Sequence, residues 1–490
     1  MASNNKFRKP HLCSLTYPQK ITFFILLFTV VALLLREPSS YTTCTTTSSS
    51  LPTPWYGDLR KAQFSWNRLP FTHEQSPPVS LKIAVFSRKW PVGGTPGGME
   101  RHALTLYTAL ARRGHQVHVF TSPPDHLPSN NLADSPASMS PQIHYHESTT
   151  GKWEYRLAWS LFEEENQGSP FDVVHSESVA LPHWLARDVP NLAVSWHGIA
   201  LESLQSDIYQ DLAFRPDDQP MPASVSNGMQ GVLPKILKEI RFFKSYAHHV
   251  AISDSCGEML RDVYQIPNKR VHVILNGVNE DDFGIDESLG EEFRIKFGVP
   301  KNASVVLGVA GRLVRDKGHP LLHEAFSNLL AKHSNVYLIV AGSGPWENRY
   351  KDLGSQVIVL GSMKPSELKG FYNAIDIFVN PTMRPQGLDL TLMEAMMSGK
   401  PLLTSRFPSI KGSVVVNDEF GFMFSPNVVS LVETLENVVE EGAKRLKTRG
   451  RACREYAASM FTARKMALAY ERLFLCIKNE TFCEYPLPMD

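Results

Sequence analysis

One pattern occurs twice along the chain and constrains its fold more than any other feature: a short apolar segment, then a glycine-containing loop, then a helix. In the first copy, residues 81–87 (LKIAVFS) suit a buried parallel strand, and the glycine-rich loop 93–98 follows. The next helix begins near Met99 and stops at Gly114, a residue type favoured just after a helix end. The second copy begins with 304–311 (SVVLGVAG). The sequence therefore predicts an α/β protein with two similar halves.

Further apolar segments predict the other strands and helices of both halves. The strands are 117–121, 171–174, 192–196, 248–252, 336–340, 357–360, 375–379 and 401–404, and the helices are 320–332, 366–374, 390–397 and 452–477. Open α/β sheets bind ligands beyond the carboxyl ends of their strands, where the loop 93–98 lies. Two such halves facing each other make a cleft, and clefts between domains are favoured ligand sites.

Composition divides the chain into six segments. They are a tail at 1–20, an apolar segment at 21–35, a Pro-, Ser- and Thr-rich stem without a packed core at 36–80, the two α/β halves at 81–285 and 286–460, and a C-terminal helix and tail at 461–490. The boundary between the halves lies in a polar, acidic stretch near 280–300.

The apolar segment 21–35 is interrupted in polarity only by two threonines, and basic residues but no acid precede it. The excess of positive charge before the segment predicts a single-pass membrane anchor, with the N-terminus in the cytosol and the rest in the lumen. A short span suits the thinner Golgi or early secretory membranes. Three other interpretations stay open: a cleaved signal peptide that leads to secretion, an organelle transit peptide, and a buried core helix.

Cysteines, sequons and net charge restrict the possible compartment and binding partners further. Sequons at Asn302 and Asn479 would be open to glycosylation in a lumen. Six cysteines are too few for a disulfide scaffold, and the absence of a CxxC pair argues against structural zinc. We expect Cys476 and Cys483 to form a local disulfide. A net charge of +1 provides no overall field that would attract nucleic acid.

Two segments of the second half carry residues expected to bind a diphosphate. The loop 311–318 places Arg312 and Lys317 after a strand and before a helix N-terminus, where cations and free amides suit phosphate. An ordinary solvated cation pair is the alternative. Further on, Gly387 permits close backbone approach to a ligand. Glu394 lies about two turns into the next helix and could accept hydrogen bonds from two ribose hydroxyls, or could simply face solvent.

With these residues in place, the chain resembles the retaining glycosyltransferases of family 4, which have the GT-B fold of two Rossmann-like domains facing across a cleft. The resemblance covers roughly residues 81–475, and its pieces occur in the family's order. They are GGTPGGME at 93–100, SWHG at 195–198, AISDS at 251–255, LNGVNEDDF at 275–283, GRLVRDKG at 311–318, AGSGP at 341–345 and the helix with Glu394. Each piece alone is weakly specific, whereas all of them in order are specific.

The resemblance implies that a hexosyl group moves, with retention, from a nucleotide-diphosphate sugar to an unidentified hydroxyl acceptor; uridine is the favoured nucleoside. It implies that Arg312 and Lys317 hold the donor phosphates and that Glu394 binds the ribose. Gly387 and Leu388 would offer amides to the donor, and Gly361 would lie near the nucleobase. His197 would contact the transferred sugar, and Gly97 and Gly98 would face the phosphate or acceptor. The resemblance implies no metal or other cofactor, and no convincing DxD motif stands at a strand end. It also implies that the leaving diphosphate itself deprotonates the acceptor hydroxyl. The second half would carry the nucleotide and the first half the acceptor, and the terminal helix would cross back to the first half.

The chain departs from the family pattern at Gln386, where a glutamate usually stands eight positions before Glu394. Gln386 stays a catalytic candidate, because it keeps an acceptor oxygen for a sugar hydroxyl although it lacks the negative charge. Leu388 and Asp389 replace the usual Phe and Gly. Asp389 would put an anion near the phosphates unless it caps the helix and points away, and Arg384 could offset its charge. These changes predict an altered donor or rate rather than loss of the site.

Two other classes of function stay open. A non-catalytic nucleotide-sugar-binding or glycan-binding protein on a degenerate transferase scaffold would explain Gln386, although the retained Arg312, Lys317 and Glu394 argue against it. A dinucleotide oxidoreductase would need G-x-G-x-x-G after a strand, and neither GGTPGG nor GSGPWE supplies it. An irregular polar insertion predicted at 205–232 would help to shape the acceptor side.

Overall fold

The computed structural model describes residues 55–71, 77–91, 96–124, 139–148, 151–216, 218–242 and 247–487. The predicted tail (1–20), the predicted membrane anchor (21–35) and the first part of the predicted stem lie outside these residues. No helix within the described ranges is both long enough and apolar enough to span a bilayer.

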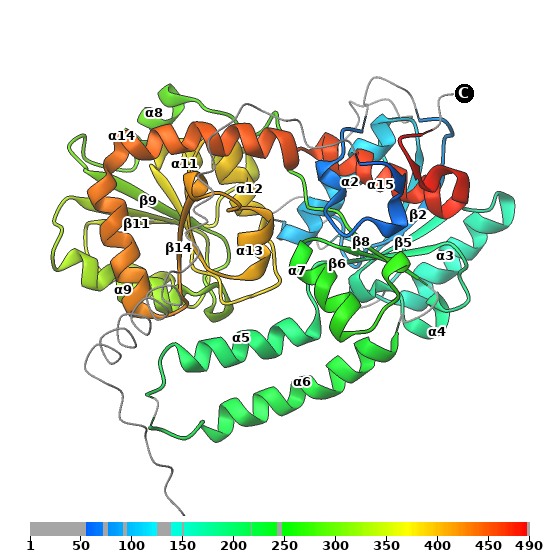
Figure 1. Cartoon of the computed structure of the whole chain (residues 1–490), viewed down its shortest axis with the longest axis horizontal. Helices are drawn as coiled ribbons and strands as arrows, with labels where there is room; N and C mark the ends of the chain where they lie inside the picture. The colour runs from blue at the N-terminus through cyan, green and yellow to red at the C-terminus, as the bar shows by residue number, and fades with distance from the viewer. Residues whose placement is uncertain are drawn as a thin grey trace, which may run out of the picture. The chain divides into compact units, whose positions relative to one another are not determined.

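A seven-stranded parallel sheet forms the centre of the first half, with the strand order β4-β3-β2-β5-β6-β7-β8. Figure 1 labels β2, β5, β6 and β8 of this sheet. Its strands are β2 (Lys82–Phe86), β3 (Gln116–Thr121), β4 (Gln142–Tyr145), β5 (Val173–Glu177), β6 (Leu192–Trp196), β7 (His248–Ala251) and β8 (Val271–Val273). Its helices are α2 (Gly98–Arg112), α3 (Tyr155–Gly168), α4 (His183–Ala186), α5 (Ala200–Leu212), α6 (Ala223–Phe242) and α7 (Asp254–Glu258).

A six-stranded parallel sheet forms the centre of the second half, with the order β11-β10-β9-β12-β13-β14. Its strands are β9 (Val305–Ala310), β10 (Val336–Ala341), β11 (Val357–Gly361), β12 (Ile377–Asn380), β13 (Leu402–Ser405) and β14 (Gly421–Phe424). Its helices are α8 (Glu287–Lys296), α9 (His319–Leu330), α10 (Glu347–Lys351), α11 (Pro365–Ala374), α12 (Leu390–Met397), α13 (Pro408–Ser413) and α14 (Val428–Met460). The two α/β halves are therefore confirmed. The predicted strands coincide with observed ones to within a few residues, whereas the prediction missed β4, β8 and β14.

Helices cover both faces of each sheet, which explains why the strands are apolar on both sides. In the first half, α2 and the last helix, α15 (Ala463–Lys478), bury one sheet face, with Tyr107 and Phe474 fully enclosed. In the second half, α9 and the start of α14 bury one face, while α11 and α12 bury the other.

The predicted single helix at 452–477 is wrong, because the chain breaks between α14 and α15. Thr462 has extended backbone angles and its hydroxyl accepts a hydrogen bond from the Lys465 amide, so it caps α15. Helical periodicity continues across the break, which hides it in the sequence. After the break, α15 packs against α2 of the first half, where Glu471 binds Arg113.

The prediction of a stem without a packed core is wrong for residues 55–71. Trp66 is fully buried, and the Asn67 side chain donates to the carbonyls of Leu275 and Met460. The strand β1 (Gly57–Asp58) pairs with β15 (Glu484–Tyr485). The buried apolar residues stand singly among polar residues, so no periodic pattern marked this segment as folded.

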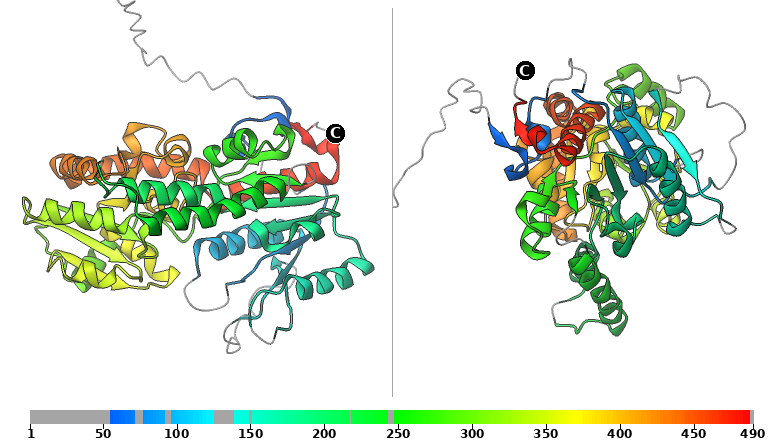
Figure 2. Two further views of the ribbon diagram at one scale, coloured as in Figure 1. Left: turned by 90° about the horizontal axis from the view of Figure 1, so that it is seen from below. Right: turned by 90° about the vertical axis from the view of Figure 1, so that its right-hand side faces the viewer.

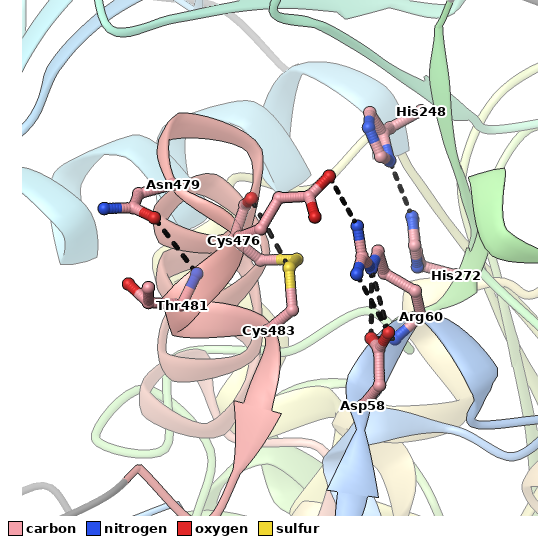
Figure 3. Close-up of polar contacts among 9 residues, drawn as sticks. Asp58, Arg60, His248, His272, Cys476, Asn479, Thr481 and Cys483 are labelled. Carbon is pink, nitrogen blue, oxygen red and sulfur yellow. Dashed lines mark hydrogen bonds and ion pairs between the residues drawn. A yellow bond between two sulfur atoms is a disulfide. The ribbon is translucent and has the colours of Figure 1, made fainter.

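The expected disulfide between Cys476 and Cys483 is present, and it lies beside this N-terminal segment (Figure 3). Arg60 links the two chain regions, because it binds Asp58 at 2.9 Å and Glu480 at 3.1 Å. The disulfide and the ion pairs thus hold the C-terminal end of the chain against the first half.

The predicted irregular insertion at 205–232 is wrong in part, because α5 includes residues 205–212 and α6 includes residues 223–232, and only 213–222 lie between the two helices. The two helices pack against each other and project from the first half (Figures 1 and 2). Tyr209 of α5 contacts Phe407 of the second half, with ring centroids 5.0 Å apart. The polar composition reflects exposure of a helical pair rather than lack of structure.

Candidate active site between the two sheets

A cavity of about 650 Å³ lies where the carboxyl ends of the strands of both sheets meet. Its walls come from the segments that follow β2, β6, β7 and β8 in the first half and β9, β10, β11 and β12 in the second. Six of the predicted site residues line it: Gly97, Gly98, His197, Arg312, Lys317 and Leu388. Gly361, Gln386, Gly387 and Glu394 do not line it but lie close behind its walls.

The loop between β9 and α9 provides the cationic wall. Gly318 has φ +77°, and a Cβ added there would lie 1.7 Å from the carbonyl oxygen of Pro381, so only glycine lets the loop lie against the end of β12. This contact presents the N-terminus of α9 and the side chain of Lys317 to the cavity. Arg312 is exposed and makes no ion pair within the described part of the chain.

Asp389 is the anion of the same wall, and it binds Lys317 through an ion pair. Burial alone would raise the pKa of Asp389, but Lys317 and Arg384 lower it to about 2. Asp389 stands at the cap position of α12, yet its carboxylate makes no capping hydrogen bond and instead accepts one from Asn380 at 3.1 Å. The idea that it caps the helix and points away is therefore wrong. Arg384 does offset its charge, as expected, and Lys317 is its ion-pair partner.

Glu394 of α12 is buried and has a partner on each carboxylate oxygen. Arg101 of α2 binds one oxygen at 2.5 Å, and the Tyr372 hydroxyl donates to the other at 2.7 Å. Arg101 lines the cavity, so this ion pair crosses from one half to the other. Sequence reasoning missed Arg101, although it directly follows the glycine loop within GGMER.

Gln386 lies behind the cavity wall at a second contact between the halves. Its backbone N–H donates to Glu202 of α5 at 3.2 Å, and its carbonyl accepts from the Ser253 hydroxyl at 3.0 Å. Arg384 binds the Glu202 carboxylate at 2.7 Å. A Cβ on Gly387 would lie 2.8 Å from that carboxylate, so the glycine allows close approach to α5.

Gly361 ends β11 with φ +72°, and its carbonyl accepts a hydrogen bond from the Gly342 amide at 2.7 Å. The two residues that follow it, Ser362 and Met363, line the cavity in its place. Gly361 thus shapes the turn that presents these neighbours.

The first half contributes a buried cluster around His197, which directly follows β6. The last residue of β5, Glu177, accepts hydrogen bonds from Nε2 of His197 and from the Tyr107 hydroxyl. His102 lies beside them, with its ring centroid 4.6 Å from that of His197. Burial lowers the pKa of His102 to about 3, so it is neutral at pH 7. Its ring nitrogens make no well-formed hydrogen bond, although Asn276 lies nearby.

Among the residues that the structure describes, His102, Glu177 and His197 form the group that could hold a metal ion. Ligand atoms of His102, Glu177 and His197 lie within 4.8 Å of one another, and two imidazoles with a carboxylate suit a transition metal. Both oxygens of Glu177 already accept hydrogen bonds, so a metal would have to displace the proton of His197 or Tyr107. The carboxylate is therefore arranged as an acceptor for these two donors.

The fold and the cavity define a class of protein: two α/β domains that face each other across a cavity. One wall carries a cationic loop, and the other carries an imidazole that binds a buried carboxylate behind it. Sequence models of two families match the chain. The model described as "Glycosyltransferase Family 4" matches residues 96–282, and the one described as "Glycosyl transferases group 1" matches residues 291–457. The chain belongs to glycosyltransferase family 4, as its motifs suggested.

Relatives and solved structures agree with this assignment. An uncharacterised glycosyltransferase of Methanocaldococcus jannaschii is 27% identical over 342 residues, which is 66% of this chain and 80% of the relative. Sucrose-phosphate synthase from Thermosynechococcus elongatus has a TM-score of 0.62 at 17% identity, over 81% of this chain and 98% of that one. The Anabaena protein HepE, solved in complex with UDP-glucose, has a TM-score of 0.56 at 16% identity, over 80% and 99%. The structural likeness shows the GT-B fold.

Proposed function

We propose that this glycosyltransferase moves a hexosyl group, with retention, from a nucleotide-diphosphate sugar to an acceptor hydroxyl, and that the nucleotide is uridine diphosphate. One observation carries the proposal: the cavity brings Arg312, Lys317 and the N-terminus of α9 opposite Gly97, Gly98 and His197. Cations and free helix amides suit a diphosphate. A cavity of about 650 Å³ falls within the range of small-molecule sites. HepE, which shares the fold, was solved with UDP-glucose.

In the proposed reaction, the bond between the anomeric carbon and the diphosphate oxygen breaks, and the acceptor oxygen bonds to the same face of that carbon. The acceptor proton passes to the leaving diphosphate. Arg312 and Lys317 stabilise the negative charge that grows on that group, and such stabilisation accelerates the step because it is stronger in the transition state. His197 contacts the transferred sugar from the other wall.

The proposed role of Glu394 requires an exchange of partners. Its carboxylate binds Arg101 and Tyr372, so two ribose hydroxyls would replace the guanidinium of Arg101. Arg101 would then be free to contact the donor, because it already lines the cavity. Gln386 would act through its backbone contacts to α5, because its side chain is buried behind the wall.

The proposal includes a single-pass protein of Golgi or early secretory membranes whose catalytic part is lumenal, and a transfer that needs no metal. The disulfide between Cys476 and Cys483 supports an oxidising compartment. The sequon residues Asn302 and Asn479 are both exposed, as glycosylation requires.

The test is nucleotide release from a panel of nucleotide-sugar donors by the full-length chain, with added divalent metal or with EDTA, beside Glu394→Ala. Metal-independent release from one donor, lost in the variant, would support the proposal and name the sugar. Stabilisation by a nucleotide diphosphate without release, again lost in the variant, would mean that the site needs its acceptor. A folded protein that shows neither signal would contradict the proposal and favour a glycan-binding protein on a transferase scaffold.

A further inference from the structure

We propose that Glu177 is a positioning residue for His197 and takes part in sugar transfer although it does not line the cavity. The inference rests on the proposed function, because it assigns a role within that reaction. Glu177 is the last residue of β5, and His197 directly follows β6, the neighbouring strand. The parallel pairing of these strands places both residues at the same edge of the sheet, beside the cavity.

The contact between the two side chains leaves His197 one free ring nitrogen. Glu177 is 1% exposed, and its two oxygens accept from Nε2 of His197 and from the Tyr107 hydroxyl. A buried carboxylate is costly unless it is bonded in this way, so the geometry is strongly held. The His197 ring is 12% exposed and borders the cavity. Because Nε2 is bound to Glu177, Nδ1 is the ring nitrogen left to contact a ligand.

A chain of hydrogen bonds anchors Glu177 to the C-terminal helix. Because Tyr107 donates to Glu177, its oxygen must accept from Nδ1 of His175 at 2.8 Å. Burial lowers the pKa of His175 to about 4, so the ring is neutral and its Nε2 accepts from the Ser195 hydroxyl at 2.8 Å. Ser195 then accepts from the Tyr470 hydroxyl of α15 at 2.7 Å. Along this series of hydrogen bonds, every donor points toward Glu177.

The charge of Glu177 acts mainly on His197. Burial alone would raise the pKa of this carboxyl, but His197 lowers it, so Glu177 is ionised at pH 7. The other groups that face it are neutral at that pH. Burial keeps His102 and His175 unprotonated, and it raises the pKa values of Tyr107 and Tyr470.

The first experiment compares Glu177→Gln with Glu471→Gln in the full-length chain. Glu471 is a matched control, because it is also buried and its carboxylate also binds a histidine, His115, at 2.9 Å, together with Arg113. It does not line the cavity.

Glu177→Gln should lower kcat for transfer about tenfold or more, because a misplaced contact slows the step, while the donor KM and stabilisation by nucleotide diphosphate stay unchanged. Glu471→Gln should lower the unfolding temperature without changing kcat. Equal losses of kcat in both variants, or a change of KM alone in Glu177→Gln, would overturn the inference.

The second experiment reads the His197 ring directly by ¹⁵N NMR of the histidine-labelled full-length chain at pH 8, with the signal assigned through His197→Gln. We expect hydrogen on Nε2 in the wild type and a mixture of tautomers in Glu177→Gln. Hydrogen on Nδ1 alone in the wild type would overturn the inference, because Nε2 would then have nothing to donate. The wild-type measurement tests the role of Glu177 even if the Glu177→Gln variant does not fold.

The two proposals fail in different ways. A wild-type chain that neither releases nucleotide nor is stabilised by nucleotide diphosphate contradicts the transferase proposal, whatever the tautomer of His197. A wild-type chain that transfers sugar but carries hydrogen on Nδ1 contradicts only the role of Glu177.

Discussion

The two walls of the cavity carry ionisable groups in opposite ways. The wall of the second half keeps its charges near water: Arg312 is exposed, and Lys317 and Asp389 are 17% and 22% exposed. The first half buries its charge behind the wall: Glu177 is 1% exposed, and it binds His197, which borders the cavity. A site for a charged, exchangeable ligand needs cations that water and ligand can both reach, whereas a site that orients a ring needs a fixed partner.

The comparison also shows how the walls are held together. Arg101 of the first half binds Glu394 of the second, and Arg384 of the second half binds Glu202 of the first. Each pair joins a buried carboxylate to a guanidinium on the border of the cavity. The contacts that close the cleft therefore share groups with the proposed donor site, so binding and closure are expected to be coupled.

The largest expected effect comes from removing the most exposed cation of the second wall. Arg312→Ala should lower kcat/KM for the donor about 100-fold, because the leaving diphosphate loses a partner in the transition state. The unfolding temperature should not change, since Arg312 is exposed. Arg315→Ala is the matched control, because it removes an exposed arginine of the same loop that does not line the cavity. Similar losses in both variants, measured by steady-state kinetics, would contradict a specific role.

Glu394→Gln should raise the donor KM about tenfold, because charge-assisted hydrogen bonds to the ribose are lost. The free energy of unfolding should fall by about 2 kcal/mol, because the hydrogen bond between Arg101 and the charged carboxylate is lost. Urea denaturation and donor titration measure the two effects. Tyr372→Phe removes the other hydrogen bond but keeps the charge, so a KM change as large as that of Glu394→Gln would argue against ribose binding.

Asp389→Asn should move affinity and stability in opposite directions. The donor KM should fall roughly threefold to fivefold, because Lys317 is no longer neutralised. Stability at pH 7 should fall by about 2 kcal/mol, the value of lowering the pKa from 3.8 to about 2.

The pH dependence of this stability difference has a definite sign. Because the folded pKa of Asp389 is lowered, its contribution is present above pH 3.8 and is lost as the pH falls through about 2. At pH 3 about half of the difference between Asp389→Asn and the wild type should remain. A difference in unfolding free energy that grows as the pH falls would contradict the ion pair with Lys317.

The smallest expected effect is that of metal removal. Excess EDTA should leave the transfer rate unchanged, because Arg312 and Lys317 stabilise the leaving diphosphate in the proposed reaction. The measurement is the initial rate of nucleotide release with EDTA and after each divalent metal is added back. If EDTA lowered the rate of nucleotide release and one added metal restored it, an ion would lie in the cleft. The cluster of His102, Glu177 and His197 would be the first candidate for its site.

Local sequence predicted much of the fold and part of the site. Strands and helices follow from periodicity, and Arg312, Lys317 and His197 stand directly after strands whose carboxyl ends meet at one cavity. The prediction failed where structure depends on contacts distant in sequence. Trp66 is buried because α15 and His272 of β8 lie against it, and the break at Thr462 follows from packing on the first half.

The amino-acid sequence by itself determined the two α/β halves, the order of the family motifs and the loop that carries the cations, because these depend on neighbours a few positions apart. Only the tertiary structure decided which carboxylates meet which donors. Glu394 binds Arg101 of the other half, Asp389 binds Lys317 of another loop in its own half, and Glu177 binds His197, which follows the neighbouring strand. The physical reason is that such a contact depends on distance and burial in space. These are set by the fold of one half for Asp389 and for Glu177, and only when the two halves face each other for Glu394.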